Sequence, residues 1–431
     1  MKSAIMSMKY WEMEVQEDIF SMVMPLIKQS IEELSPTMDL WSSCFSRIFH
    51  NRDPNTMEKL YNYLSDWTLH DVTFSTVLQR KTHFLCQSML SNHWKLAELN
   101  KHILTKVTPF LDNPYQSFRE AIAKLLYIIF LPDVEFNNVH STRSPHAAQF
   151  FNDVLLPRLK FLNSPKQNID DEEYKKNKLL LKTVCCWLNM ASLCQRIWPE
   201  AYQLVGILCQ TRRNDLNSET SVLCTKSLNF LAKNVHTKSH FLKTFDYIYF
   251  VFTNDNLSSN AKISLLQFTQ VFVFHNIPYL FSDNNRISKI SDVIVNFLFD
   301  LDVDVKHATR AVLRDFLRCN MSDVQVLIDR FTQGCSKPVI SNKKESISTI
   351  QGNILGLLAV IDASPYEIPD YIVNILETLS QHLMDPHPIP NWIATAVDNF
   401  RHTQPNKLLL IEKVPSDLLQ LLSGSKLTYY S

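Results

Sequence analysis

The scarcity of glycine constrains this chain more than any other feature. Only five of its 431 residues are glycine, and the first is Gly206, whereas the usual share is about 7 %. Rossmann and Walker loops need clustered glycines, because glycine adopts positive φ freely and lets the backbone approach a phosphate closely. The sequence therefore argues against a large nucleotide-binding α/β enzyme. We also expect closely stacked helices of this chain to exclude glycine.

The remaining composition favours a soluble, helical, intracellular protein. Hydrophobic residues make up 45 % of the chain, and 43 basic residues balance 43 acidic ones. This balance argues against general binding to nucleic acid or to an anionic membrane. Nine cysteines, most within apolar runs and none in a C-x-x-C pair, indicate reduced, buried thiols. No secretory signal peptide is apparent, and no apolar run reaches the roughly 18 residues of a membrane span.

Apolar residues recur at helical rather than strand spacing. The clearest sets are Ile19, Met22, Leu26 and Ile27, and then Met57, Leu60, Tyr61 and Leu64. No run of strands with alternating polarity is apparent, so we expect an all-α fold. Three polar, aperiodic stretches are predicted to be mobile loops, namely residues 132–147, 163–177 and 334–346.

A more specific pattern appears at three places along the chain. In residues 111–126 and 299–313, an apolar helix end is followed by an Asp-containing turn and by an apolar-basic pair that opens the next helix. Residues 383–397 follow the same pattern without the basic residue. Asp300 and Asp385 lie about two periods of 40–47 residues apart. The pattern resembles the HEAT repeat, in which the acidic turn residue caps the next helix and helix pairs stack. We therefore predict an α-solenoid of degenerate HEAT-like repeats over residues 1–422 without an internal domain boundary, and an extended tail over residues 423–431.

A search for catalytic or metal-binding patterns finds none with specificity. His236 and His240 have helical metal-ligand spacing, but no third ligand and no H-E-x-x-H motif accompany them, which favours a structural role. The apolar surroundings of Cys185 and Cys186 disfavour a thiolate nucleophile. A nucleophile elbow and a kinase signature are both lacking. We predict that the chain is not an enzyme and carries no metal site or cofactor of its own.

The C-terminal stretch S-D-L-L-Q-L-L-S-G-S-K-L-T-Y-Y-S predicts a short last helix that ends at Gly424. Gly424 and Ser425 would then form a hinge that lets the tail leave the solenoid. The tail ends in Tyr429, Tyr430 and Ser431. A frayed terminus is the alternative interpretation.

The ending hydrophobic-Tyr-any residue is the signature of proteasome activators. The upstream stretches G-L-L-A-V-I-D-A-S-P-Y-E-I-P-D-Y-I and L-S-Q-H-L-M-D-P-H-P-I resemble the large HEAT-repeat proteasome activator family, of the proteasome activator complex subunit 4 type. S-T-R-S-P-H (141–146) and L-P-R-L-K-F-L (156–162) are also similar to that family. The resemblance covers most of the chain and is strongest from about residue 285 onward.

The resemblance implies a non-catalytic activator that caps the proteasome core particle in the nucleus and cytoplasm. Its tail would enter a pocket between neighbouring α-subunits and promote gate opening and ubiquitin-independent degradation. There the Ser431 carboxylate would pair with a lysine, the Tyr430 ring would fill or brace the pocket, and Tyr429 would add an apolar contact. Two readings stay open beside it: a truncated paralogue that binds the core particle without full activation, and a generic HEAT scaffold for other proteins.

Some properties of the family do not carry over to this chain. Its members are several times longer, and their inositol-phosphate sites gather basic residues from distant parts of that length. The family is also linked to DNA repair and to acetylated histones, through a bromodomain-like region that recognises acetyl-lysine. Asn320 and Met321 match the Asn-Phe pair of that region, so the asparagine remains while the phenyl ring does not. A capping role for Asn320 is the favoured alternative.

Energetic magnitudes limit what the tail does by itself. Two partly buried rings contribute ~2–5 kcal/mol and a charge-assisted hydrogen bond adds roughly 1.5–3 kcal/mol. Ordering each flexible residue costs ~1 kcal/mol or more. We therefore expect weak binding by the tail alone, and a second contact surface on the solenoid.

Overall fold

The computed structural model describes most of the chain as two compact units, Met1–Leu231 and Ala232–Ser431. The described residues are 11–32, 57–67, 75–92, 96–133, 135–136, 139–140, 143–163, 171–193, 197–214, 218–234, 237–253, 257–336, 344–404, 410 and 412–424.

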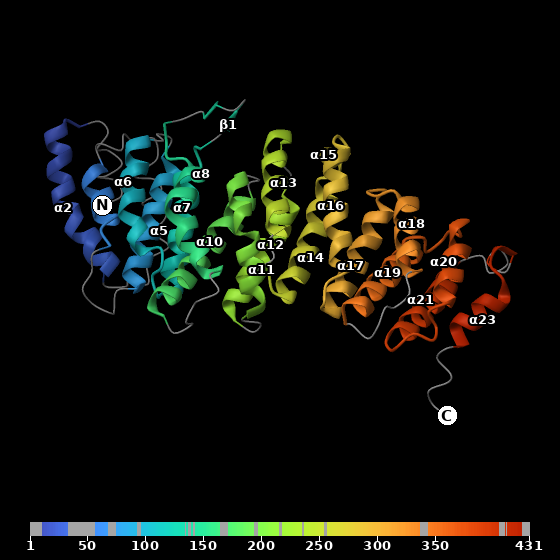
Figure 1. Ribbon diagram of the computed structural model, residues 1–431. Coiled ribbons are helices and arrows are strands. Elements are labelled where there is room, and N and C mark those ends of the chain that lie inside the picture. The colour runs from blue at the N-terminus through green and yellow to red at the C-terminus, as the bar shows by residue number, and fades with distance from the viewer. Residues whose placement is uncertain are drawn as a thin grey trace. The chain divides into compact units, whose positions relative to one another are not determined.

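The first unit consists of helices with one short hairpin (Figure 1). Its elements are α2 (Met13–Glu32), α4 (Glu58–Leu64), α5 (Ser75–Ser91), α6 (Ala97–Val107), η4 (Thr108–Phe110), α7 (Gln116–Phe130), β1 (Glu135–Phe136), β2 (Val139–His140), α8 (Ala147–Phe150), η5 (Phe151–Leu155), α9 (Leu156–Lys160), η6 (Phe161–Asn163), α10 (Glu172–Leu193), η7 (Pro199–Leu204), α11 (Val205–Asn214) and α12 (Glu219–Lys233), the last of which extends past the boundary of the unit.

The second unit is helical throughout its described residues. Its elements are α13 (Lys238–Phe252), α14 (Ser259–His275), α15 (Ile277–Leu280), α16 (Asn284–Phe297), α17 (Val303–Arg318), α18 (Val324–Cys335), α19 (Lys344–Ala363), α20 (Tyr371–Ser380), α21 (Ile389–Thr403) and α23 (Ser416–Gly424).

Within each unit the helices pack on helices that are close in sequence. In the first unit α7 lies between α5 and α10, and in the second unit α14, α17, α19 and α21 form a continuous series of packed helices (Figure 1). This arrangement is that of stacked helix pairs. The prediction of an all-α fold built from HEAT-like repeats is therefore confirmed.

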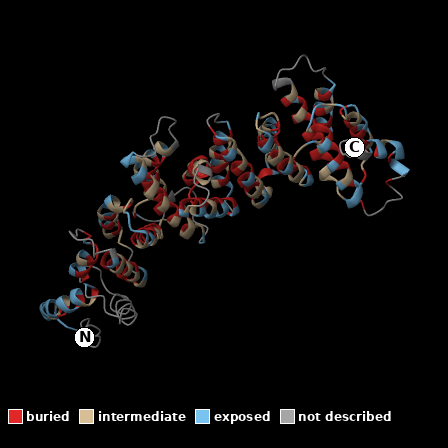
Figure 2. Ribbon diagram, turned by 90° about the horizontal axis from the view of Figure 1, so that it is seen from below, coloured by how far each residue is buried: buried red, intermediate tan, exposed pale blue. Residues whose placement is uncertain are grey.

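The buried residues lie on the faces that the helices turn toward their neighbours (Figure 2). In the first unit the ring of Trp187 lies 4.6 Å from that of Trp198 and 5.2 Å from that of Phe130. In the second unit Phe241 of α13 stacks on Phe272 of α14 at 5.9 Å. Aromatic contacts of this kind bury large apolar areas between successive helices.

The periodicity identified the buried face of α4 correctly but not that of α2. In and beside α4, the predicted residues Met57, Leu60, Tyr61 and Leu64 are all buried. In α2, Met22 and Leu26 are exposed, and the buried face consists of Phe20, Val23, Ile27 and Ile31. Both sets in α2 have helical spacing, so only packing against the neighbouring helix selects between them.

The predicted capping by a turn aspartate is confirmed at the α16–α17 turn and is wrong at the turns before α7 and α21. Asp112 pairs with Arg158 at 2.5 Å, Asp300 with Lys262 at 2.7 Å and Asp385 with His382 at 2.7 Å. At the α16–α17 turn the cap is Asp302, whose carboxylate accepts the Asp304 N–H at 2.8 Å. Asp112 and Asp300 therefore join different elements by ion pairs, whereas Asp385 pairs within its own turn.

The expectation that stacked helices exclude glycine is also wrong. Gly352 and Gly356 lie inside α19, where a Cβ atom would come within 2.6 Å of the Leu298 carbonyl oxygen and of the Phe331 ring, respectively. These glycines permit close helix approach, a use that the overall scarcity of glycine does not reveal.

The first predicted loop connects α7 to α8 as expected, whereas the second and third are shorter than expected. Residues 132–147 contain the antiparallel β1–β2 pair, and Asp133 binds His146 at 2.8 Å. Helix α10 already begins at Glu172, within the second stretch, and α18 and α19 take the ends of the third. The loop prediction was too long in these two stretches because the exposed ends of the helices carry polar side chains, as loops do.

Candidate functional site

The last helix, α23, forms an anchor directly before the predicted docking tail. It ends at Gly424, as the sequence predicts, and packs on α20 and α21 (Figure 1). Leu422 is fully buried and Leu419 is buried, whereas Leu421 between them is 56 % exposed. The apolar face of α23 therefore holds the end of the helix on the second unit.

A second contact fixes the segment just before α23. The Lys413 Nζ donates to the Ile368 carbonyl oxygen and to Asp370 Oδ1, both at 3.0 Å. Val414, next to it, is fully buried. Together these contacts attach the start of α23 beside the start of α20.

The tail residues themselves lie outside the described residues. These are Ser425, Tyr429, Tyr430 and Ser431. His236 of the predicted histidine pair also lies outside them, while His240 is on α13. Among the described residues no group of three His, Cys, Asp or Glu side chains is placed to hold a metal ion.

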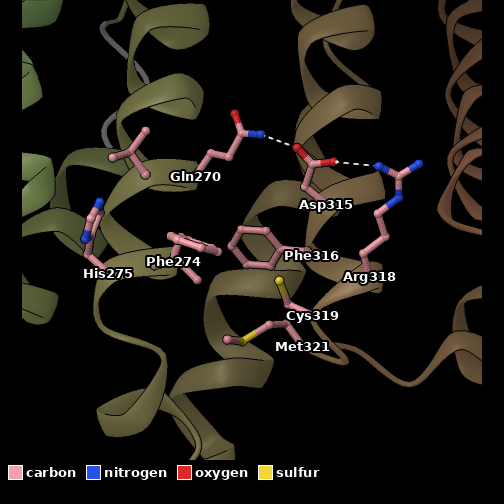
Figure 3. A pocket seen from close by; sticks show the side chains of 10 residues that line it. Gln270, Phe274, His275, Asp315, Phe316, Arg318, Cys319 and Met321 are labelled. Carbon is pink, nitrogen blue, oxygen red and sulfur yellow. Dashed lines mark hydrogen bonds and ion pairs between the residues drawn. The ribbon is translucent and has the colours of Figure 1, made fainter.

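A pocket opens between α14 and α17 in the second unit and has a volume of about 530 Å³ (Figure 3). We call it the α14–α17 pocket. It is lined by Gln270, Val271, Val273, Phe274, His275, Asp315, Phe316, Arg318, Cys319 and Met321. Val273, Phe316 and Met321 are buried. The size and the mostly apolar lining suit an aliphatic or aromatic group.

The polar groups of this pocket are bonded to one another. Asp315 accepts a hydrogen bond from the Gln270 amide and pairs with Arg314 at 2.7 Å. Arg318 lies 3.9 Å from Asp315 and donates to the Asp362 carbonyl oxygen at 2.7 Å. Because basic groups already surround Asp315, the pocket favours a neutral group over a cation.

Asn320, the predicted acetyl-lysine residue, closes the end of α17. It has a φ of 53°, and the Met321 N–H donates to the Phe316 carbonyl oxygen at 3.0 Å. A left-handed residue with this hydrogen bond is a Schellman cap, for which asparagine is among the favoured residues. The side chain is exposed, while Met321 next to it is buried in the pocket lining. The capping role is therefore confirmed, and the acetyl-lysine role stays a prediction.

The described cysteines are thiols without disulfide bonds. Burial raises the pKa of Cys186 and of Cys209 to about 12. The pKa of Cys185 is raised by its hydrogen bond with Cys224 and by burial. Raised pKa values keep these thiols protonated, so the geometry gives no thiolate nucleophile here.

The basic residues of the two apolar-basic pairs are present as predicted, but their burial was not foreseen. Lys306 of α17 is fully buried, and its Nζ donates to the Ser348 Oγ at 2.7 Å and carbonyl oxygen at 2.9 Å, and to Gln351 Oε1 at 3.1 Å. Burial lowers its pKa to about 8. In the first unit, buried Arg119 bonds the carbonyl oxygens of Asn113 and Pro114 at 2.8 Å. Both bases lie shortly after a turn aspartate, which is the signal that identifies them.

No helix among the described residues is long and apolar enough to cross a membrane.

Comparison with known proteins relates the chain to one family. Residues 347–424 match the family described as proteasome activator complex subunit 4-like, C-terminal. Over 92 % of its length the chain is 24 % identical to proteasome activator complex subunit 4A of Danio rerio and to proteasome activator complex subunit 4 of Homo sapiens. It is 25 % identical over 46 % of its length to proteasome activator subunit 4 of Arabidopsis thaliana.

The chain spans 23 % of the length of the fish and human relatives. Among solved structures, the karyopherin Kap121p bound to the extreme C-terminus of the protein phosphatase Cdc14p aligns with 93 % of this chain and 41 % of its own, at 15 % identity and a TM-score of 0.48.

Proposed function

This chain is related to the C-terminal region of the proteasome activator complex subunit 4 family, and from that premise we propose that it is a non-catalytic proteasome activator. It binds the end of the core particle and inserts residues 429–431 between two α-subunits. Docking of the tail promotes opening of the gate and ubiquitin-independent degradation. The proposal includes action in both nucleus and cytoplasm.

One observation carries the proposal: the similarity extends over 92 % of the chain to proteins named proteasome activator complex subunit 4. The family match covers residues 347–424, which comprise nearly all of α19 and then α20, α21 and α23. The part of the chain that most resembles the family therefore ends where the tail begins.

The anchoring of α23 supports tail docking on physical grounds. A tail loses less conformational entropy on binding when the segment before it is already fixed. Leu422, two residues before Gly424, is fully buried, so the chain is held on the second unit close to the end of α23. In the pocket, the Ser431 carboxylate would pair with a lysine and the two tyrosine rings would cover apolar surface.

A binding assay with purified core particle tests the proposal. The full chain is compared with a chain that lacks residues 429–431, by pull-down and by hydrolysis of a fluorogenic peptide. We expect the full chain to bind and to raise peptide hydrolysis, and the shortened chain to lose the stimulation. Binding and stimulation that persist undiminished in the shortened chain would contradict tail docking and favour a scaffold that binds through its helices.

A second candidate function concerns acetyl-lysine, and the α14–α17 pocket favours it. Cys319 and Met321 line the pocket on either side of Asn320 in the sequence. An acetylated lysine side chain is neutral and largely aliphatic, which suits the apolar lining. Asn320 itself is not among the residues that line the pocket, but its side-chain amide is a suitable donor to an acetyl oxygen.

Titration with acetylated and unmodified lysine peptides of histone sequence tests this second function. Asn320→Asp retains a side chain that tolerates the left-handed conformation and removes the amide donor. We expect the acetylated peptide to bind the original chain more tightly, and this preference to disappear in the variant. Equal binding of both peptides by the original chain would exclude the function.

A further inference from the structure

Two buried cysteines of the first unit face each other between α10 and α12. The side chains of Cys185, on α10, and Cys224, on α12, are hydrogen-bonded to each other. Cys185 is 1 % exposed and Cys224 is fully buried. Both are free thiols. Two sulfur atoms from different helices therefore lie next to each other inside the unit.

Polar contacts on both sides of this pair fix how α10 and α12 are aligned. On one side the Lys182 Nζ pairs with Glu219 Oε2 at 2.5 Å. On the other side the Ser227 Oγ donates to Asn189 Oδ1 at 3.0 Å. The partners follow one another in the same order along both helices, so α10 and α12 run in the same direction. The two cysteines occupy the middle position between these contacts.

This arrangement suits a disulfide bond better than a metal ion. A disulfide needs only two facing cysteines on neighbouring elements, whereas a metal ion needs further ligands. Among the described residues no group of three His, Cys, Asp or Glu side chains is placed to supply them. Because its hydrogen bond with Cys224 and its burial raise the pKa of Cys185, the packed pair stays protonated and unreactive. The pair is therefore open to oxidation only when α12 separates locally from α10.

We propose that Cys185 and Cys224 form a redox-sensitive disulfide that joins α12 to α10 when the chain is exposed to hydrogen peroxide. During a local separation one thiol loses its proton and attacks a peroxide oxygen. An S–O bond forms, the O–O bond breaks, and the released hydroxide takes up the proton to give water. The second thiol then attacks the sulfenic sulfur, which forms the S–S bond and releases a second water. Two thiols thus lose two electrons and two protons, and one hydrogen peroxide is reduced to two waters.

The bond would change the mechanical coupling within the first unit. In an array of stacked helices each element contacts mainly its neighbours, so a covalent bond between α10 and α12 adds to the contacts that hold them together. The closed loop runs from residue 185 to residue 224 and contains η7 and α11. Closing it restricts the unfolded chain, so oxidation should stabilise the unit.

Peptide mapping of the full chain after treatment with hydrogen peroxide tests the proposal. The remaining thiols are alkylated, and the chain is digested with trypsin without reduction. We expect a linked pair of the peptides 183–196 and 214–226, and loss of free Cys224 before loss of free Cys209. Cys209 of α11 is the matched reference, because it is fully buried as well and burial raises its pKa to about 12.

Alanine variants assign the bond to its two sulfur atoms. The linked peptides should disappear in Cys185→Ala and persist in Cys186→Ala, which changes the adjacent cysteine of the same peptide. A link that persists in Cys185→Ala, or loss of free Cys209 as fast as of free Cys224, overturns the proposal. So does the lack of any link once the partly exposed Cys319 has been oxidised in the same sample.

Urea denaturation gives a second readout, which shows whether the bond holds the helices together. Oxidation should raise the urea midpoint of the original chain, and dithiothreitol should reverse the rise. The rise should be lost in Cys224→Ala and kept in Cys209→Ala. Equal midpoints of the oxidised and reduced chains, with the link demonstrated in the same sample, would show that the bond does not strengthen the unit and would overturn the proposal.

Discussion

At the scale of single residues, the left-handed conformation of Asn320 makes a prediction about stability. A β-branched side chain at a φ of 53° is strained by ~1–2 kcal/mol, whereas glycine adopts this conformation freely. We expect Asn320→Val to lower the free energy of unfolding by about that amount and Asn320→Gly to change it little. Urea denaturation measures both, and Asn391→Val, at an exposed position in α21, is the control. Equal effects of Asn320→Val and Asn391→Val would contradict the strain argument.

Lys306 makes stability depend on pH. Its pKa is about 8 in the folded chain, because burial disfavours the charge, and 10.5 in an exposed lysine. Between these values the unfolded chain binds a proton at Lys306 that the folded chain lacks, so this residue raises stability as pH rises. Below about pH 8 the folded state carries the cost of a buried charge.

Comparison with Lys306→Met isolates this dependence from that of other groups. The difference in unfolding free energy between the two chains should shift in favour of the original chain as pH rises from 8 to 10.5. Urea denaturation at several pH values measures the shift. A difference that is constant with pH, or that shifts the other way, would show that Lys306 stays charged when buried.

At the scale of elements, the glycines of α19 allow a test of how closely the helices pack. Alanine is the better helix former, but a Cβ at Gly356 would lie 2.6 Å from the Phe331 ring. We expect Gly356→Ala to destabilise the second unit by about 1–3 kcal/mol. At Gly334 the three atoms nearest to the Cβ all belong to the Asn353 side-chain amide, the end of a rotatable side chain, so Gly334→Ala should cost less than Gly356→Ala. Thermal unfolding of both variants measures how much stability each one loses. A larger loss in Gly334→Ala than in Gly356→Ala would contradict this packing argument.

The anchor helix α23 offers a second test at this scale. Leu422→Ala removes a fully buried side chain and should cost about 2–4 kcal/mol locally. Leu421→Ala, at the neighbouring exposed position, should cost little. Hydrogen exchange of residues 416–424 should accelerate in the first variant alone. Equal acceleration in both would mean that the buried face does not hold the helix.

The helices and turns also show which structural features could be predicted from the sequence alone. Helical periodicity and Asp-containing turns were sufficient to predict stacked helix pairs and the end of α23 at Gly424. They did not identify the buried face of α2, because two faces of that helix carry apolar residues at equivalent spacing. They also did not reveal that Asp112 and Asp300 pair with bases on other elements, or that α19 uses glycine for close approach. Each of these depends on a neighbouring helix, and local spacing contains no information about the neighbour.

At the scale of the whole molecule, the proposed function divides binding between a body of packed helices and a short tail. The sequence pattern indicated the tail and the energetic need for another contact. The structure adds the position of α23, which is held on α20 and α21 directly before that tail. The α14–α17 pocket could not be predicted, since residues from two helices meet there across a long stretch of sequence.

The central claim is that the terminal carboxylate and the two tyrosines together dock on the core particle. The most direct measurement compares the chain with a free C-terminus and the same chain with an amidated C-terminus, prepared by ligating a synthetic tail peptide. Amidation removes the charge of Ser431 and keeps both rings. We predict that the amidated chain loses the stimulation of peptide hydrolysis and binds core particle more weakly, by roughly tenfold or more. Equal stimulation by the two chains would contradict the account.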